Sequence, residues 1–417
     1  MTLADDPVDP MLTDFSTDQL ARNGIPDARA RRDRQRCLDV IRNVLGDRLG
    51  PDGIDASPLG VEWTEVFDVR PSAHLDTELL IRAGWLPLDG LLGRRGRHLS
   101  RSRRWAVVEE GQVLAGIRLV DGDPDAVRSV LDRCRERSEV RLREVLELRE
   151  LRRQGAAFPS SAAVLRMAAE IESGLGGRLL APWATGRTAA APVALPSRRR
   201  GPVVAISGVD GSGKSTLRTA VAAHLDRAGL HVSTVWVRPG MGLGPLLSVA
   251  AGVKRLLRME GTPGLHAMAR PDVARPPSRR GLLGWTWALL VTVSFLLGVW
   301  RQHASGRGVV LYDRHLIDAL ATLDFAYDGV DLRVQHRLVR ALLPSAEFRL
   351  YLDVPAEVSV QRKPDDVLGE HAVRRQLDSY RTWLDRLPAV VQLDATRPSA
   401  DLAVEVLRVI TLGVRGA

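Results

Sequence analysis

A glycine-rich segment near the middle of the chain carries the residues best suited to chemistry. Residues 208–216 read GVDGSGKST and satisfy the pattern GxxxxGK[ST]. Glycines let the backbone turn tightly enough for its N–H groups to surround phosphate oxygens, and the N-terminal end of the following helix attracts the same anion. The pattern therefore predicts a phosphate-binding loop. Its candidate residues are Gly208, Gly211, Ser212, Gly213, Lys214, Ser215 and Thr216.

Two side chains of this loop have distinct predicted roles. Lys214 is expected to reach the β- and γ-phosphates of ATP, and the Ser215 hydroxyl is expected to ligate Mg²⁺. ATP and Mg²⁺ are therefore the predicted cofactors. The alternative interpretation is an ordinary glycine-rich turn between a strand and a helix, with an exposed lysine.

A second polar pair, Asp313 and Arg314, directly follows the apolar run GVVLY. In an open α/β sheet, ligands bind at the carboxyl ends of the strands. Asp313 is therefore expected to hold Mg²⁺ beside Ser215, and Arg314 to bind an acceptor phosphate as a bidentate fork. A surface Asp-Arg pair that begins a helix is the alternative.

The elements that must position these residues alternate between strand and helix. The pattern predicts strands at 203–207, 231–237, 309–312 and 347–352, and a helix at 215–228. Apolar runs separated by helical stretches indicate a parallel sheet covered on both faces. The predicted fold class for 202–417 is therefore α/β, a P-loop NTPase-type parallel sheet flanked by helices.

The first half of the chain has a different organisation. Residues 1–30 are typical of an unstructured tail, 31–180 of a smaller α+β domain, and 181–201, rich in Ala, Pro and Arg, of a linker. An amphipathic helix is predicted over 28–45, because Cys37, Leu38, Ile41 and Leu45 fall on one stripe. The other predicted elements are a strand at 61–69, a helix at 74–83, a hairpin of 104–108 and 112–120 that turns at 109–111, and helices at 123–153 and 160–175.

The motifs of the second half, in this order, resemble the thymidylate kinase family and its looser relatives. The matching segments are GVDGSGKST, YDRH at 312–315, RLYLDVPAEVSVQRK at 349–363, Tyr380, and VVQLDATRP at 390–398. The resemblance covers about 200–415, half of the chain. It implies a P-loop kinase that transfers a phosphoryl group from ATP to a nucleoside monophosphate or a related small acceptor.

The resemblance also implies roles on the acceptor side. Asp210 is similar to the loop acid that contacts the acceptor sugar, Arg314 to the arginine on the acceptor phosphate, and Arg238 to the arginine of an Arg-Pro-Gly turn after the second strand. Residues 361–376 are similar to the lid. The lid cations that would reach the transferring phosphates are Arg362, Lys363, Arg374 and Arg375.

Departures from the family pattern concern the base of the acceptor. Leu323 stands where the family has a base-contacting glutamine, and the helical stretch 282–300, which should contribute an arginine, carries no charge. The glutamate of the Arg-Pro-Gly turn is missing too. The acceptor is therefore expected to be recognised through phosphate or hydroxyl groups. Kinase activity is better supported than the use of thymidylate as the acceptor.

The uncharged stretch 282–300 is also long enough to cross a membrane. One span would place Lys214 and Arg314 on opposite sides of a bilayer, although the kinase interpretation needs both at one phosphate chain. A buried core helix is therefore expected. Peripheral membrane contact near 255–301 stays open as the alternative, because several arginines lie close by.

The first half faintly resembles a nucleotidyltransferase-like domain in its order of elements between 61 and 135. It has Asp68 and Asp76 but neither a Gly-Ser pair nor acids spaced DxD, so a catalytically degenerate domain is expected. His74 and Asp76 are expected to be ordinary helix-start residues. The arginine-rich stretch 94–104 is expected to be a solvated loop, with a phosphate- or partner-binding patch as the alternative.

Composition limits the class of protein. The 417 residues carry 59 basic and 50 acidic side chains, a formal net charge of +9, with only three lysines and two cysteines. The start of the chain lacks the apolar run of a secretory signal, so a cytoplasmic protein is expected. Nucleic acid is not expected to be the main partner, and the oligomeric state stays open, a homodimer included. The alternative function is a nucleotide-binding regulatory or scaffold protein that uses its P-loop as a switch.

Overall fold

The fold is mixed α/β, and one of its two compact units contains a parallel five-stranded sheet flanked by helices. The computed structural model describes residues 28–55, 66–71, 77–92, 103–120, 200–236, 281–363 and 369–412, with single residues and pairs between 57 and 194. The first unit comprises Met1–Gly201 and Ala223–His231. The second comprises Pro202–Ala222 and Val232–Ala417.

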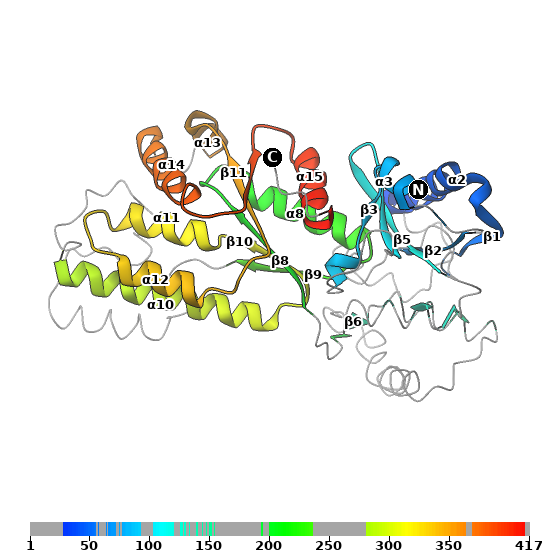
Figure 1. Cartoon of the computed structure of the whole chain (residues 1–417), viewed down its shortest axis with the longest axis horizontal. Coiled ribbons are helices and arrows are strands. Elements are labelled where there is room, and N and C mark those ends of the chain that lie inside the picture. Colours follow the sequence, from blue (N-terminus) through cyan, green and yellow to red (C-terminus); the bar gives the residue numbers. More distant parts are fainter. Residues whose placement is uncertain are drawn as a thin grey trace. The chain divides into compact units, whose positions relative to one another are not determined.

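The sheet of the second unit has the strand order β12-β11-β8-β10-β9 (Figure 1). Its strands are β8 (Arg200–Ser207), β9 (Val232–Trp236), β10 (Gly308–Asp313), β11 (Phe348–Asp353) and β12 (Val390–Asp394). β8 is central, so the chain leaves it towards β9 and β10 on one side and later towards β11 and β12 on the other. The loops after β8, β10 and β11 diverge at the carboxyl edge, which is where such sheets bind ligands.

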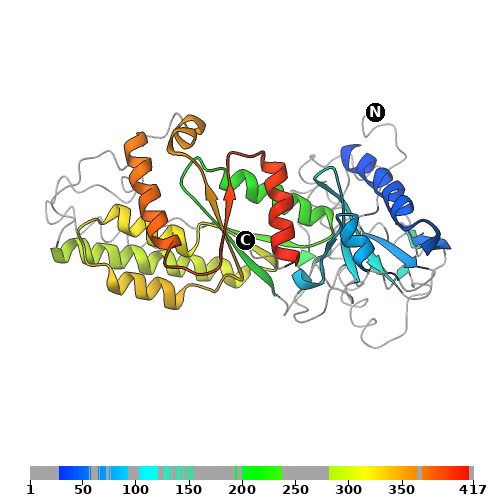
Figure 2. The same ribbon diagram turned by 45° about the horizontal axis from the view of Figure 1, so that its top comes forward.

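Helices cover both faces of this sheet. Figures 1 and 2 show α10, α11 and α12 on one side and α8 and α15 on the other. This cover explains why β10 is a continuous apolar run, with five of its six residues buried. The helices are α8 (Lys214–Arg227), α10 (Gly281–Ser305), α11 (Leu316–Ala326), α12 (Arg333–Leu342), α13 (Ala356–Arg362), α14 (Glu370–Leu384) and α15 (Ser399–Leu412).

The uncharged stretch 282–300 lies within α10. Among the described residues this helix alone is long and apolar enough to cross a membrane, over Gly284–Ser305, and 47% of that stretch is buried within the protein. Val291, Phe295 and Val299 are buried on one side. Val293, Leu297 and Trp300 on the other side are exposed, so α10 is a helix of the packed unit with an exposed apolar row.

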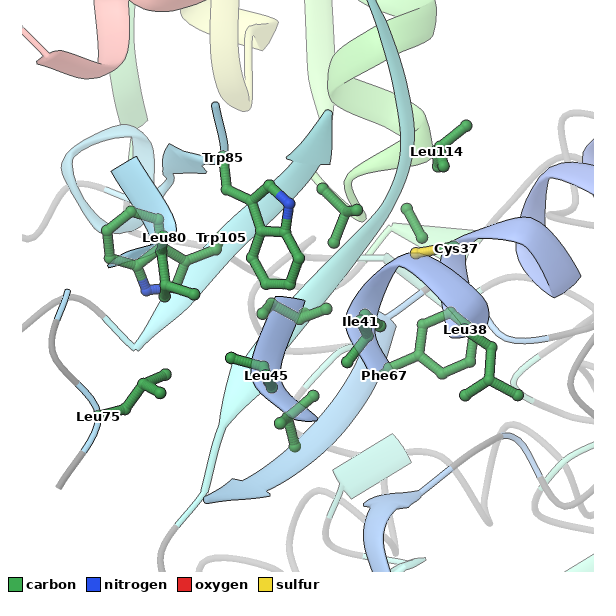
Figure 3. Close-up of a cluster of buried hydrophobic side chains, with 14 residues drawn as sticks. Cys37, Leu38, Ile41, Leu45, Phe67, Leu75, Leu80, Trp85, Trp105 and Leu114 are labelled. Carbon is green, nitrogen blue, oxygen red and sulfur yellow. The ribbon is translucent and has the colours of Figure 1, made fainter. Parts of the chain in front are cut away.

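The first unit holds a mixed sheet in the order β1-β2-β5-β4-β3. Its strands are β1 (Leu49–Asp55), β2 (Val66–Pro71), β3 (Leu86–Pro87), β4 (Arg104–Glu109) and β5 (Gln112–Leu119), with helices α2 (Ala28–Leu45) and α3 (Thr77–Arg82). Figure 3 shows the stripe of α2 facing the sheet, with Ile41 and Leu45 in the same buried cluster as Phe67, Trp85 and Trp105. The predicted stripe is therefore the core of this unit.

Several predicted domain boundaries differ from the structure, and strand pairing, which composition does not reveal, sets those that involve strands. α2 begins at Ala28, inside the predicted tail 1–30. The predicted linker 181–201 contains β7 (Val193–Ala194), which pairs with β6 (Glu139–Val140), and β8 begins at Arg200. The first predicted strand is shifted to Val66–Pro71. The predicted helix 160–175 and most of 123–153 and 94–104 lie outside the described residues.

Asp68, a candidate metal-binding acid of the first unit, is already paired in the structure. Its Oδ1 and Oδ2 accept hydrogen bonds from Nε and Nη2 of Arg118 at 2.7 and 2.6 Å, and Ser129 Oγ donates to Oδ2 at 2.6 Å. Burial alone would raise the pKa of Asp68, but the hydrogen bonds and charge of Arg118 hold it below its usual value. The carboxylate is therefore a buried structural group. His74 and Asp76 lie outside the described residues.

The variant Asp68→Asn is expected to lower the free energy of unfolding by about 3 kcal/mol, because it removes the buried carboxylate that pairs with the largely buried Arg118 guanidinium. The folded-state pKa of Asp68 lies below its unfolded value of about 3.9. The stability it supplies is therefore complete above that pH and is lost as the pH falls through the folded pKa. Urea unfolding should show the variant's deficit at neutral pH and a smaller deficit in acid.

Glu78→Gln is the matched control, because Glu78 pairs with Arg82 at 2.9 Å on the exposed surface of α3. Its effect should stay within about 0.5 kcal/mol. An Asp68→Asn variant as stable as the wild type at pH 7 would show that the pair is not a structural support.

Candidate active site

The glycine-rich loop 208–213 connects β8 to α8 in a conformation that requires glycine. Gly208 and Gly211 have φ angles of 154° and 85°, which L side chains rarely adopt. A Cβ atom on Gly211 would lie 2.4 Å from the carbonyl oxygen of Ser359 in α13. Ser359 Oγ in turn donates to the carbonyl oxygen of Asp210 at 2.5 Å. The loop is thus held in shape by direct backbone contact with α13.

Lys214 folds back onto this loop. Its Nζ donates to the carbonyl oxygens of Gly208 and Val209, both at 2.7 Å, and lies 3.8 Å from Oδ1 of Asp210. Burial, and then the charge of Arg314, lower the pKa of Lys214. A phosphate bound in the loop would offer this ammonium an anionic partner in place of two neutral carbonyl oxygens.

Ser215, in the first turn of α8, meets Asp313, the last residue of β10. Ser215 Oγ donates to Oδ2 of Asp313 at 3.0 Å across 98 residues of sequence. Hydroxyl and carboxylate oxygens are ligands that Mg²⁺ prefers, so this donor set fits the ion. Ser215 and Thr216 are exposed at the start of α8, whereas Ser212 is buried within the loop.

Arg218 also contacts Asp313, and the sequence analysis missed it. Its Nη1 donates to Oδ2 of Asp313 at 3.0 Å. Arg218 lies three residues after Ser215 on α8, and this spacing places both side chains on one face of the helix. That spacing was the available signal. The Arg218 guanidinium restricts the orientation of the Asp313 carboxylate. It also adds a positive charge beside the predicted metal ligands.

Arg314 and Asp210 form an ion pair at the same carboxyl edge of the sheet. Arg314 Nη2 lies 2.5 Å from Oδ1 of Asp210. Burial alone would lower the pKa of Arg314, but carboxylates, Asp210 first, raise it. The backbone of Arg314 has a φ of 76°, a left-handed conformation that is uncommon for a residue with a side chain. The two residues that the resemblance assigns to the acceptor therefore face each other.

A buried polar group beneath the loop connects it to α11 and α14. Asp318 accepts hydrogen bonds from the backbone N–H of Gly208 at 3.2 Å and of His315 at 3.0 Å, and from Tyr380 Oη at 2.8 Å. Tyr380 Oη also lies 3.0 Å from the carbonyl oxygen of Gly208. Burial, and then the Asp318 charge, raise the pKa of Tyr380 well above its usual value, so it stays a neutral donor.

Asp318 was not among the predicted site residues, although its signal was present. An acid three residues after His315 is the spacing of a capping box at the start of a helix, and the structure forms that box at α11. The same carboxylate then reaches Gly208, so one side chain caps a helix and fixes the first residue of the loop.

Among the predicted lid cations, Arg362 lies at the loop. It ends α13, its Nη1 donates to the carbonyl oxygen of Ala395 at 2.9 Å, and the same atom lies 3.9 Å from the position of a Cβ on Gly213. Lys363, which follows it, is exposed.

The other two lid arginines are paired with acids of α13, α14 and the segment between α11 and α12. Arg374 is 57% exposed and pairs with Glu370 at 2.6 Å and with Glu357. Arg375 lies 3.9 Å from Asp328. Neither makes a recorded contact with the described residues of the loop. Arg238 and residues 364–368 of the predicted lid lie outside the described residues.

Comparisons with known proteins add little to this geometry. No protein-family model matches the sequence, and no curated protein matches it either. Among solved structures, the chain is similar to deoxyadenosine kinase from M. mycoides with products dCMP and a flexible dCDP bound. That match has 15% sequence identity and a TM-score of 0.32, and it covers 51% of this chain and 100% of the other. A likeness of this size carries no argument, so the site is interpreted from its own contacts.

Proposed function

We propose that the second unit is a P-loop kinase that transfers the γ-phosphoryl group of ATP to a small acceptor, a nucleoside monophosphate or a related phosphorylated or hydroxylated molecule. The supporting observation is the convergence of Lys214, Ser215, Asp313 and Arg314 at one edge of the sheet. A nucleotide-binding switch needs only Lys214, Ser215 and Asp313, which serve ATP and its metal ion. Arg314 is the additional cation that an acceptor requires.

On the donor side, the loop and Lys214 would hold the phosphates of ATP. Backbone N–H groups of the loop after Gly208 and the amino end of α8 would attract phosphate oxygens, and Lys214 would leave the carbonyl oxygens of Gly208 and Val209 to meet the β- and γ-phosphates. Asp318 and Tyr380 would keep the loop in its bound shape, because they already fix Gly208 on both its polar atoms.

For the metal, the Ser215 hydroxyl and the Asp313 carboxylate would supply protein ligands. Mg²⁺, when bound, would neutralise charge on the transferring phosphoryl group. Arg218 would act as a positioning residue, since its Nη1 donates to Oδ2 of Asp313, the same oxygen that accepts the hydrogen bond of Ser215.

On the acceptor side, Arg314 would bind a phosphate and Asp210 a hydroxyl group. A bound phosphate would replace Asp210 as the partner of Arg314, and the freed carboxylate could accept a hydrogen bond from the acceptor. Rate enhancement would come from positioning and charge neutralisation, because phosphoryl transfer asks little covalent chemistry of the protein.

The lid arginines would complete the site when the lid closes. Arg362 already lies beside the loop. Arg374 would have to leave Glu370 and Glu357 to reach a phosphate. Exposed ion pairs of this kind are weak in water, so breaking them costs little free energy.

Purified protein with ATP and Mg²⁺ should release ADP faster when one of a panel of acceptors is added. The panel should contain thymidylate, uridylate, cytidylate, nucleosides and sugar alcohols, with a reaction lacking acceptor as the baseline. Leu323 is buried in α11, so no hydrogen-bonding side chain stands at that position to distinguish the bases. Selectivity among pyrimidine monophosphates should therefore stay within the roughly 10- to 200-fold that apolar contacts provide.

Two outcomes would contradict this proposal in different ways. Tight ATP binding without any acceptor-stimulated release of ADP would favour the nucleotide-binding regulatory or scaffold protein. A thymidylate preference beyond roughly 200-fold would instead show that groups reading the base exist, and only the substrate part of the proposal would fail.

A further inference from the structure

The exposed apolar side chains of the described residues gather on two neighbouring helices. The large apolar side chains that stand out into solvent are Val293, Leu297 and Trp300 on α10, and Val334 and Leu342 on α12. Val293, Leu297 and Trp300 are spaced i, i+4 and i+7, so they form one row along α10. Leu297 is 55% exposed and Trp300 48%. We name these five residues the α10/α12 face.

The two helices lie side by side and form one surface. Trp300 Nε1 donates to the carbonyl oxygen of Leu342 at 2.7 Å, and Gln335 Nε2 donates to the carbonyl oxygen of Trp285 at 3.1 Å. The carboxyl ends of α10 and α12 therefore adjoin, as do their amino ends. Figures 1 and 2 both show the helices running together along one side of the unit.

The charged side chains that α10 and α12 themselves contribute are all basic. Neither the 25 residues of α10 nor the 10 residues of α12 include an acid. Arg301 continues the row of Leu297 by one turn, and Arg337 and Arg340 are exposed on α12. Within the part of the chain that the structure describes, these three arginines form no ion pair. Arg333, by contrast, is neutralised by Asp331 at 2.5 Å.

We propose that the α10/α12 face binds peripherally to an anionic phospholipid bilayer. Such a surface offers what the face lacks: an apolar layer for Leu297 and Val293, and phosphate and carboxylate groups for the arginines. Trp300 suits the boundary, because its ring is apolar and its N–H is already bonded to Leu342. The helix lies on the membrane rather than crossing it, since 47% of its apolar stretch is buried in the unit.

A second copy of the chain fits this face less well. In a two-fold symmetric interface the same patch occurs on both partners, so Arg301, Arg337 and Arg340 would approach the equivalent arginines of the other copy. No acid on α10 or α12 would compensate these charges. Lipid phosphates supply the opposite charge, and this complementarity selects the bilayer. The inference does not depend on the proposed kinase activity.

Flotation of the full-length protein with vesicles tests the proposal. Vesicles of equal parts phosphatidylcholine and phosphatidylserine should carry the protein, whereas vesicles of phosphatidylcholine alone should not, and binding should fall as salt is raised from roughly 0.1 M towards 1 M. The double variant Arg337→Gln/Arg340→Gln should bind about 25-fold more weakly, since each basic residue near the surface contributes about fivefold. Leu297→Gln should also weaken binding.

Arg408→Gln is the matched control. Arg408 is an exposed arginine on α15, on the other side of the sheet, so its removal changes the net charge by as much as either substitution on α12 without touching the face. It should bind no more than about twofold more weakly than the wild type. Far-UV circular dichroism would establish that each variant is folded.

Three results would overturn the proposal. One is a folded wild-type protein that stays unbound with phosphatidylserine vesicles. Another is a loss of binding in Arg408→Gln equal to that of a single arginine on α12, which would mean that net charge alone is responsible. The third is a dimer in solution that Leu297→Gln converts to a monomer, which would show that a second copy covers the face.

Discussion

Replacing Lys214 with alanine is expected to lower phosphoryl transfer by at least about 10²–10³-fold while the chain remains folded. Lys214 is the buried cation of the loop, and the two carbonyl oxygens that accept its hydrogen bonds, those of Gly208 and Val209, carry no net charge. The ammonium hydrogen-bonds to the loop itself, so a phosphate bound there would lose this positive contact. Steady-state ADP release at saturating acceptor measures the effect.

Two further variants interpret that result. Lys214→Met keeps the length of the side chain and should lose as much activity as Lys214→Ala, because the charge is what matters. Arg408→Gln, far from the loop on α15, should retain full activity. Phosphoryl transfer at the wild-type rate in a folded Lys214→Ala variant would remove the basis for the kinase assignment.

Replacing Arg314 with glutamine is expected to reduce acceptor use far more than ATP binding. The guanidinium lies 2.5 Å from Asp210 and is held charged by the surrounding carboxylates, so it is poised to exchange that partner for an acceptor phosphate. We expect kcat/KM for the acceptor to fall by about 10²-fold, which is about 2.7 kcal/mol of transition-state binding. The Kd for ATP should change by no more than about threefold.

Asp210→Asn separates the two members of this pair. If Asp210 binds an acceptor hydroxyl, the single variant should raise the KM of hydroxylated acceptors, and the double variant should show less than the sum of the two losses because the residues contact each other. An Arg314→Gln variant that weakens the binding of ATP and of the acceptor equally would place Arg314 on the donor side.

The elements that the sequence predicted well are those whose signal is local. The helix over 28–45 was predicted with the bounds that α2 has, because the stripe through Cys37 and Ile41 is both the helical signal and the buried core. β10 could be predicted from its apolar run, because helices cover the sheet on both faces and the strand is therefore apolar on both sides.

Other elements were missed because tertiary pairing creates them. β1 reads LGPDGID, with two glycines and a proline, and it exists because it pairs with β2 through an irregular register. β12 was quoted only as part of a motif and was not assigned as a strand. No local pattern distinguishes such segments from loops.

The candidate site shows the same division. The loop residues and Asp313 follow from motifs, but the contact of Arg218 with Asp313 spans 95 residues and also requires the neighbouring positions of β8 and β10. Arg374 illustrates the reverse case. Its motif position predicts a phosphate contact, whereas the structure places it against Glu370, an acid four residues earlier whose helical spacing already favoured an ion pair.

Because the Tyr380 hydroxyl hydrogen-bonds to Gly208, we expect α14 and the loop to unfold together in local opening events. Tyr380 is fully buried, and its hydroxyl group joins α14 to the first residue of the loop directly and through Asp318. Local unfolding of α14 would therefore release Gly208, so a ligand that stabilises the loop must also suppress opening of a helix 172 residues away. Hydrogen exchange of the amides of α14 should accordingly slow when nucleotide binds, and the slowing should disappear in Tyr380→Phe.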